Sequence, residues 1–398
     1  MVQVCDSLGS TDQNRRSEVV ATRMHIGQLL IIGFDGTKVS PRLASLLTKI
    51  QPAGVILFAR NITGAEQTHT LLRECQKYVA TPLLTCVDLE GGTVDRFRNV
   101  IGAAPSPAEV FATGRRALFR KHGRVIGENC RALGFNLDFA PVLDLAHAAS
   151  RAVMSSRAVS DDPKQVVIYA REFLRGLGDA GVLGCGKHFP GLGEAALDTH
   201  HELPIVEKPL RKLWAEDLVP YRSLSSRREL PFIMVSHAAF PRVTPALTKA
   251  RTPASLSKKW ITGILRKKIG YRGLICSDDL EMGGVLAAAP IDQAIIEHIR
   301  AGGDLGLICH REDFILRAYE ALVREAERDA KFARHVRESA RRVLAFKKKL
   351  FTRKSAAGRR TPAPTSARVE KLRRQLWEFS EEIRLATLAR AESKKERA

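Results

Sequence analysis

The chain alternates between short apolar runs and longer amphipathic segments, and this alternation constrains its fold more than any other feature. The apolar runs have the length and the β-branched content of buried strands. They lie at 29–34, 54–59, 83–89, 135–145, 182–189, 232–237, 273–277 and 304–309. Helical patterns separate them, for example at 66–79, 116–133, 163–180, 256–269 and 290–301. This order predicts an α/β fold, a (β/α)8 TIM barrel. A doubly wound sheet is the alternative, but no GxGxxG sequence follows the first run.

Composition predicts three segments. Residues 1–24 are a polar arm, residues 25–350 are the barrel domain, and residues 351–398 are a basic linker followed by a C-terminal helix. The linker, 352–365, is rich in Pro, Ala, Thr and basic residues. In the helix after it, apolar residues recur at three- and four-residue steps, namely Val369, Leu372, Leu376, Phe379, Ile383 and Ala386. We expect this stripe to pack on the barrel rather than to pair with another chain.

Composition and charge also limit the classes of function. No run approaches the length of a membrane span, and the polar segment 1–23 lacks the order of a signal peptide, so we expect a cytoplasmic protein. The seven cysteines include no CxxC pair, and we expect neither disulfides nor a metal site nor an organic cofactor. The net charge of +21 permits nucleic-acid binding, but no nucleic-acid motif accompanies it, so we interpret it as solvated basic faces. We expect a monomer.

Polar residues gather where the predicted strands end. All strands of a (β/α)8 barrel end on one rim, where active sites form. The residues at such ends are Asp88, Glu90, Arg96, Asp144, Arg157, Lys187, His188, His237, Asp278 and Asp279. Several polar residues on one rim predict an active site.

Two motifs suggest specific chemistry. The run GKHFPG (186–191) ends a strand and is followed by Asp198 and His200. A carboxylate two residues from a histidine can orient the ring, which can then transfer a proton near neutral pH. Asp278 and Asp279 are adjacent, and strand alternation turns them to opposite sides. From the residues alone, either of these two could be a nucleophile.

These motifs together resemble glycoside hydrolase family 3, in its single-domain β-N-acetylhexosaminidase branch that acts on peptidoglycan fragments. The matching stretches are GVILFARN (54–61), VDLEGGTVDRFR (87–98), FNLDFAPVLDL (135–145), SSRAVSDDP (155–163), GKHFPGLG (186–193), DTHHELP (198–204), MVSHAAF (234–240), TPASLSKKW (252–260) and GLICSDDLEM (273–282). The resemblance covers residues 25–345 in family order.

The resemblance implies a role for each residue. Asp278 is the nucleophile of a retaining mechanism, and His200 is the general acid/base with Asp198 as its orienting partner. The residues that hold the sugar are Asp88, Arg96, Arg157, Lys187 and His188. His237 supports the neighbouring strands, whereas Glu90 and Asp144 have structural roles.

The resemblance implies a carbohydrate substrate. We expect an exo-acting β-N-acetylglucosaminidase that cleaves muropeptides in cell-wall recycling. A β-glucosidase or a glycoside phosphorylase on the same scaffold is the alternative, and a non-catalytic protein that binds sugars or anionic surfaces is a third. The family usually has a second histidine in KHFPGHG, where this chain has Leu192, and a serine where it has Thr199.

Overall fold

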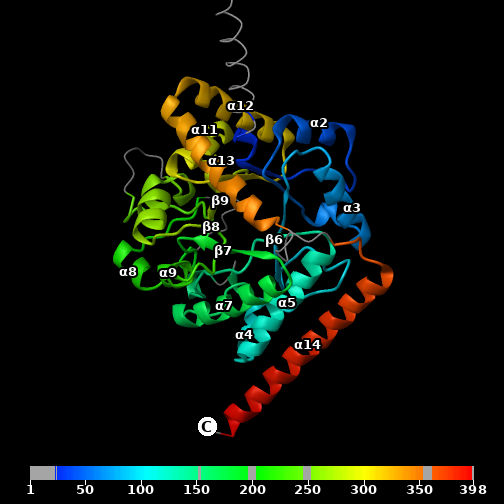
Figure 1. Cartoon of the computed structure of the whole chain (residues 1–398). Helices are drawn as coiled ribbons and strands as arrows, with labels where there is room; N and C mark the ends of the chain where they lie inside the picture. Colours follow the sequence, from blue (N-terminus) through cyan, green and yellow to red (C-terminus); the bar gives the residue numbers. More distant parts are fainter. Residues whose placement is uncertain are drawn as a thin grey trace, which may run out of the picture.

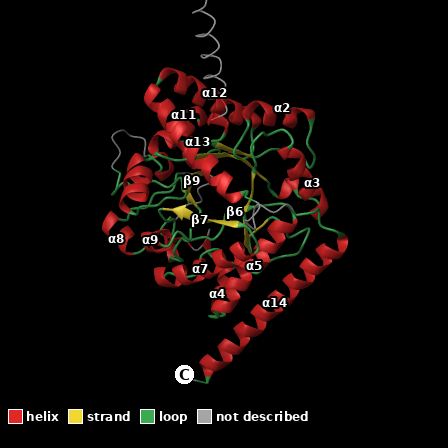
Figure 2. Ribbon diagram, in the orientation of Figure 1, coloured by secondary structure: helices red, strands yellow, loops and turns green. Residues whose placement is uncertain are grey.

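The computed structural model describes residues 23, 25–150, 154–195, 203–244, 252–352 and 361–396. These residues form a closed barrel of eight parallel strands surrounded by helices (Figure 1, Figure 2). In order around the barrel, the strands are β1 (Leu30–Ile32), β10 (Leu305–Ile308), β9 (Leu274–Asp279), β8 (Phe232–Val235), β7 (Leu183–Phe189), β6 (Leu137–Asp138), β3 (Leu84–Val87) and β2 (Gly54–Ile56). The predicted (β/α)8 fold is therefore confirmed.

Helices cover the outside of the barrel. They are α2 (Pro41–Ile50), α3 (Ala65–Gln76), α4 (Pro107–Ala112), α5 (Arg116–Ala132), α7 (Pro163–Asp179), α8 (Leu210–Ala215), α9 (Leu218–Ser226), the π-helical segment Lys259–Lys268, α10 (Gly283–Leu286), α11 (Ile291–Ala301), α12 (Glu312–Arg328), α13 (Ala330–Leu350) and α14 (Ser366–Lys395). A short antiparallel pair, β4 (Leu89–Gly91) and β5 (Val94–Asp95), follows β3. Within the described ranges, no helix is both long enough and apolar enough to cross a membrane.

The barrel interior is apolar and closed at one end by a helix. Inward-facing side chains such as Ile31, Phe139 and Phe232 form one buried cluster. Val343 and Leu350 of α13 belong to the same cluster, so this helix covers the barrel floor. Because the floor is filled, the polar residues at the strand ends lie at the opposite mouth.

One predicted strand is much shorter than expected. Apolar residues over 135–145 suggested a full strand, but only Leu137–Asp138 pairs as a strand with both neighbours. Pro141 has no N–H to donate to a ladder, and pairing resumes only as an isolated bridge between Val142 and Lys187. Around Pro141 the chain stays beside β7 through separate backbone hydrogen bonds, from the Cys185 N–H to the Ala140 carbonyl and from the Leu143 N–H to the Lys187 carbonyl.

The C-terminal helix α14 packs on the barrel, as its apolar stripe predicts. Leu372, Leu376, Phe379 and Ile383 are buried, and the helix crosses the outer side of α5 (Figure 1). The Phe379 ring stacks on His122 of α5 with the ring centroids 5.8 Å apart. The Arg373 guanidinium also donates to the carbonyl of Val100 at 2.9 Å.

Candidate active site

A buried network of charges lies at the barrel mouth, where β3 and β7 end. The Lys187 ammonium lies 2.7 Å from carboxylate oxygens of both Asp88 and Glu90. The Arg157 guanidinium donates to both carboxylate oxygens of Glu90 at 2.8 Å. Burial alone would raise the pKa of Glu90, but Arg157 and Lys187 outweigh it and hold that pKa well below its usual value. Burial likewise disfavours charge on Lys187, but Asp88 and Glu90 raise its pKa. Glu90 and Lys187 are therefore ionised at neutral pH.

His188 is held in place by Asp144. The His188 Nδ1 lies 2.7 Å from Asp144 Oδ2, which also accepts the backbone N–H of His188 at 3.2 Å. The other oxygen of Asp144 accepts the backbone N–H of Leu192 at 2.7 Å. With Nδ1 engaged, the His188 Nε2 is 3.5 Å from Arg157 Nη2. Asp144 thus joins the strand end to the start of the following loop.

The structure separates the two adjacent aspartates at the end of β9. Asp278 accepts the backbone N–H of Asp279 at 2.9 Å. Burial would raise the pKa of Asp278, but His188, the hydrogen bond from the Asp279 N–H and Lys187 lower it below the usual value. Asp279 instead has one oxygen 3.4 Å from His310 Nε2 and accepts the backbone N–H of Glu281 with the other. Asp278 is therefore the aspartate that faces the charge network.

His237 lies behind this strand end. It is fully buried, with Nδ1 2.7 Å from the Ser255 hydroxyl and Nε2 2.8 Å from the Asp279 carbonyl. Burial lowers the pKa of His237, so the ring is neutral. A neutral ring in this position fixes the backbone that carries Asp278.

Arg96 lies on the side of the mouth formed by β2. Its guanidinium carbon is 5.6 Å from the centroid of the Phe58 ring, and its buried Nε has no hydrogen-bond partner among the described residues. The same ring also contacts Arg60 at 4.8 Å and His310 at 5.0 Å. Arg96 does not touch the network around Lys187 through any described hydrogen bond.

Asp198 and His200 lie outside the described residues. The chain on either side is held by a buried lysine: the Lys208 ammonium lies 3.2 Å from Glu194, 2.6 Å from Glu216 and 2.6 Å from Asp217. Leu192, where the family has histidine, is buried in the core cluster. A side chain on Gly191, whose φ is +135°, would place its Cβ 2.8 Å from the Cβ of Asp217. This turn therefore needs glycine.

One group in the described part of the chain offers three potential metal ligands. Atoms of His147, Glu194 and Glu216 lie within 4.8 Å of one another. Both of these carboxylates already have a cationic partner, since Lys208 contacts each of them and Lys212 lies 3.4 Å from Glu194. We assign no metal or cofactor to the site.

Sequence reasoning underestimated Glu90 and did not single out Asp138. Glu90 joins Lys187 to Arg157, which makes it the centre of the network rather than a distant support. Asp138, at the end of β6, accepts the backbone N–H of Leu89 at 2.9 Å, and burial raises its pKa well above the usual value. Strand alternation within FNLDF was the available signal, since Asp138 lies between two buried apolar residues.

Comparison with known sequences identifies the class of protein. The family described as "Glycosyl hydrolase family 3 N terminal domain" matches residues 21–346. The chain belongs to glycoside hydrolase family 3.

The most similar relatives narrow this class further. A "Beta-hexosaminidase" of Alkalilimnicola ehrlichii is 37% identical over 292 residues, which cover 72% of this chain and 82% of the relative. A protein of the same name from Bordetella parapertussis is 38% identical over 267 residues, covering 65% of this chain and 73% of the relative. The solved structure of a family 3 beta-N-acetylglucosaminidase from Paenibacillus sp. is 30% identical with a TM-score of 0.82, covering 90% of this chain and 68% of that one. The β-N-acetylhexosaminidase branch is thus the part of the family to which this chain is similar.

Proposed function

We propose that this chain is a retaining exo-β-N-acetylglucosaminidase with Asp278 as its nucleophile. The observation that carries the proposal is the position of Asp278 at the end of β9, where it faces the preformed network of charged and polar groups at the barrel mouth. The names of the relatives, beta-hexosaminidase and beta-N-acetylglucosaminidase, support the same activity.

The proposed reaction has two steps. Asp278 attacks the anomeric carbon while the glycosidic C–O bond breaks, and the imidazolium of His200 donates a proton to the departing oxygen. Water then attacks the anomeric carbon of the glycosyl-enzyme, transfers its proton to neutral His200 and releases Asp278. Asp198 orients His200 in both steps. Two displacements at one carbon retain its configuration.

The remaining residues at the mouth would bind the sugar. Asp88 accepts hydrogen bonds from hydroxyl groups, and Lys187, His188 and Arg157 donate them, while Arg96 contributes from the side of Phe58. The ion pairs with Glu90 and the hydrogen bond between His188 and Asp144 hold these donors before substrate arrives, which lowers the ordering cost of binding.

The natural substrate that we propose is a muropeptide in the cytoplasm. Its carboxylates would be attracted by a protein with a net charge of +21. The ratio kcat/KM for an anionic muropeptide should therefore fall as salt is added, and that for a neutral chitobioside should change much less. Equal salt dependence for the two substrates would contradict this choice of substrate.

Chemical rescue tests the assignment of Asp278. Asp278→Ala should lose several orders of magnitude in the rate of hydrolysis of an aryl β-N-acetylglucosaminide, and added azide should restore turnover by giving the α-glycosyl azide. Asp279→Ala is the matched control and should gain nothing from azide. Wild-type rates in Asp278→Ala, or a rescued product of β configuration, would contradict the mechanism.

A second variant tests the acid/base role. His200→Ala should hydrolyse a dinitrophenyl glycoside, whose leaving group needs no proton, far better than a simple alkyl glycoside. Equal losses on both substrates would argue against proton donation by His200.

Wild-type rates and products with and without phosphate separate hydrolysis from phosphorolysis, since a phosphorylase would release sugar 1-phosphate.

A further inference from the structure

The outer face of α14 carries large apolar side chains among its charged residues. Four large hydrophobic side chains in the described part of the chain are exposed, and three of them lie on this helix. Trp377 is 67% exposed, Leu385 is 57% exposed and Leu388 is 50% exposed. The stripe that packs on the barrel lies on the other side of the helix, and these three side chains do not belong to it. Apolar groups grouped on one exposed face indicate an interaction surface.

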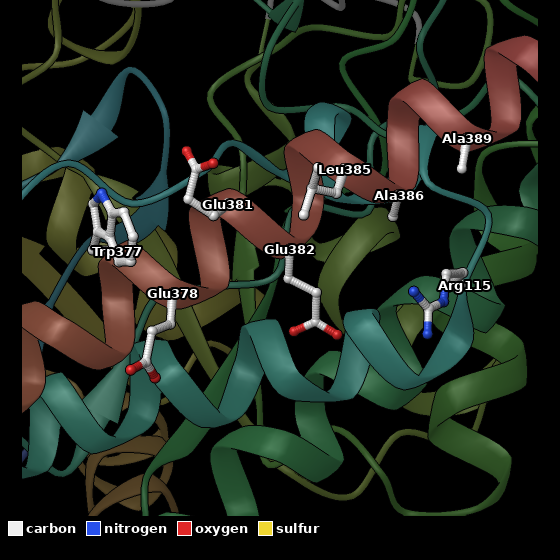
Figure 3. Close-up of a pocket in the computed structure, with 8 residues that line it drawn as sticks. All are labelled: Arg115, Trp377, Glu378, Glu381, Glu382, Leu385, Ala386 and Ala389. Atoms are coloured by element: carbon white, nitrogen blue, oxygen red, sulfur yellow. The ribbon is translucent and has the colours of Figure 1, made fainter.

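The exposed face has the spacing of a coiled-coil seam. Trp377, Glu381, Arg384 and Leu388 follow one another at steps of four, three and four residues, which keeps them in line along a helix. Leu385 flanks this line. Figure 3 shows Glu382 directed toward α5, where it pairs with Lys121 at 2.5 Å, whereas Glu381 points away from α5. The seam is therefore on the solvent side of α14.

The charges on this seam complement a second copy of the same helix. If two α14 helices cross antiparallel with their symmetry axis between positions 382 and 383, Trp377 of each copy faces Leu388 of the other. In the same register, Glu381 of each copy faces Arg384 of the other. These two side chains already form an ion pair within the helix at 2.8 Å, and both stay partly exposed. A parallel arrangement would instead place Glu381 against Glu381 and Arg384 against Arg384.

We propose that this chain forms a weak twofold dimer through antiparallel pairing of the outer faces of α14. The partner on this face is a second copy of the chain, because the charges on the face are complementary to those of the same face placed antiparallel to it. A closed twofold contact uses the same patch on both copies. The helix packs on the outer side of α5, at the edge of the molecule (Figure 1). Its outer face holds none of the residues proposed to bind or cleave the sugar, so the dimer should leave the activity of each chain unchanged. A dimer differs from the monomer expected from the sequence.

The contact is small, so dimerisation should depend on concentration. The paired region, 377–388, spans only about 18 Å of helix, and a contact of this length buries less than the ~1,600 Å² of a standard stable interface. Sedimentation velocity of the full chain over a wide range of concentrations should show a reversible shift from monomer to dimer. A chain that stays monomeric at every accessible concentration would overturn the proposal.

Charge reversal tests the partner and the register together. Glu381→Arg and Arg384→Glu should each weaken the dimer about tenfold, because symmetry places two like-charge contacts in every dimer. An equimolar mixture of the two variants should regain the wild-type affinity, since one chain then supplies only positive and the other only negative side chains at these positions. The double variant should also regain it.

Controls separate association from helix folding. Glu327→Arg makes the same change on an exposed face of α12 and should leave the monomer–dimer equilibrium unchanged. Circular dichroism and hydrolysis of the aryl glycoside should stay at wild-type values in every variant. If Glu381→Arg weakens the dimer and the mixture does not recover, the antiparallel register is wrong and the proposal fails.

Discussion

Glu90→Gln is the substitution that most directly tests how the charge network supports the site. Glutamine keeps the size of the side chain but removes its charge, and one of its two terminal groups becomes an N–H donor. In the structure, one carboxylate oxygen faces Lys187 at 2.7 Å and both face Arg157 at 2.8 Å. The new amide N–H must therefore point at a cation, and Arg157 loses its only described carboxylate partner.

The size of the effect follows from burial. Glu90 is 1% exposed and Lys187 is 2% exposed, so solvent cannot replace the lost charge. Removing one partner of a buried ion pair costs about 3 to 5 kcal/mol, and the retained carbonyl oxygen of glutamine offsets part of this cost. We expect the free energy of unfolding to fall by about 3 kcal/mol. Small displacements of Lys187 and Arg157 should lower kcat/KM by about 100-fold.

Chemical denaturation and steady-state kinetics measure the two effects separately. Glu297→Gln is the matched control, because Glu297 is 39% exposed and pairs with Arg300 on the same helix. Its loss should stay below about 1 kcal/mol. If Glu90→Gln is as stable and as active as the wild type, the network does not hold the site and the reasoning is refuted.

Two further predictions concern the barrel itself. Burial lowers the pKa of Lys347, in the barrel floor, to about 7 from 10.5. Below pH 7 the Lys347 ammonium is charged in both the folded and the unfolded chain, so the folded chain bears the full cost of burying the charge. Between pH 7 and 10.5 the folded chain has lost this proton and the unfolded chain still binds it. The free energy of unfolding should therefore rise by about 1.4 kcal/mol per pH unit in this range. Denaturation at several pH values should show this slope in the wild type and a smaller one in Lys347→Met; equal slopes would contradict it. Gly91 has a φ of +89°, and an added Cβ would lie 2.2 Å from the carbonyl oxygen of Pro105, so Gly91→Ala should lower stability by about 1 to 3 kcal/mol, measured as a drop in Tm.

The barrel could be predicted from sequence because each of its strands is a short apolar run. A strand with both faces buried appears in the sequence as a continuous apolar run, which can be recognised without knowing the strands beside it. Strands β7 and β9 lie close to their predicted positions. The run at 135–145 failed because hydrophobicity does not report whether a backbone N–H is available. Pro141 has none, so burial continued where the strand did not.

The site was predictable in its residues but not in their connections. The end of each strand identified Asp88, Lys187 and Asp278 as rim residues. The contact of Glu90 with Arg157 joins positions that are 67 residues apart, and no local pattern predicts such a pair. The apolar stripe of α14 that packs on the barrel could be predicted from its helical periodicity. The exposed apolar residues of α14 could not, because charged residues lie between them.

The buried ammonium of Lys208 has a consequence for how this enzyme can change. It holds Glu194 against Glu216 and Asp217, and so fixes the two chain positions that flank residues 195–207. When both ends of a segment are fixed, lengthening it is inexpensive, because each doubling of length costs only about 0.6 kcal/mol. Insertions between Glu194 and Pro204, a stretch that includes Asp198 and His200, should therefore cost the barrel little stability, whereas Val206, which is buried and donates its backbone N–H to the Ala239 carbonyl, belongs to the fixed part.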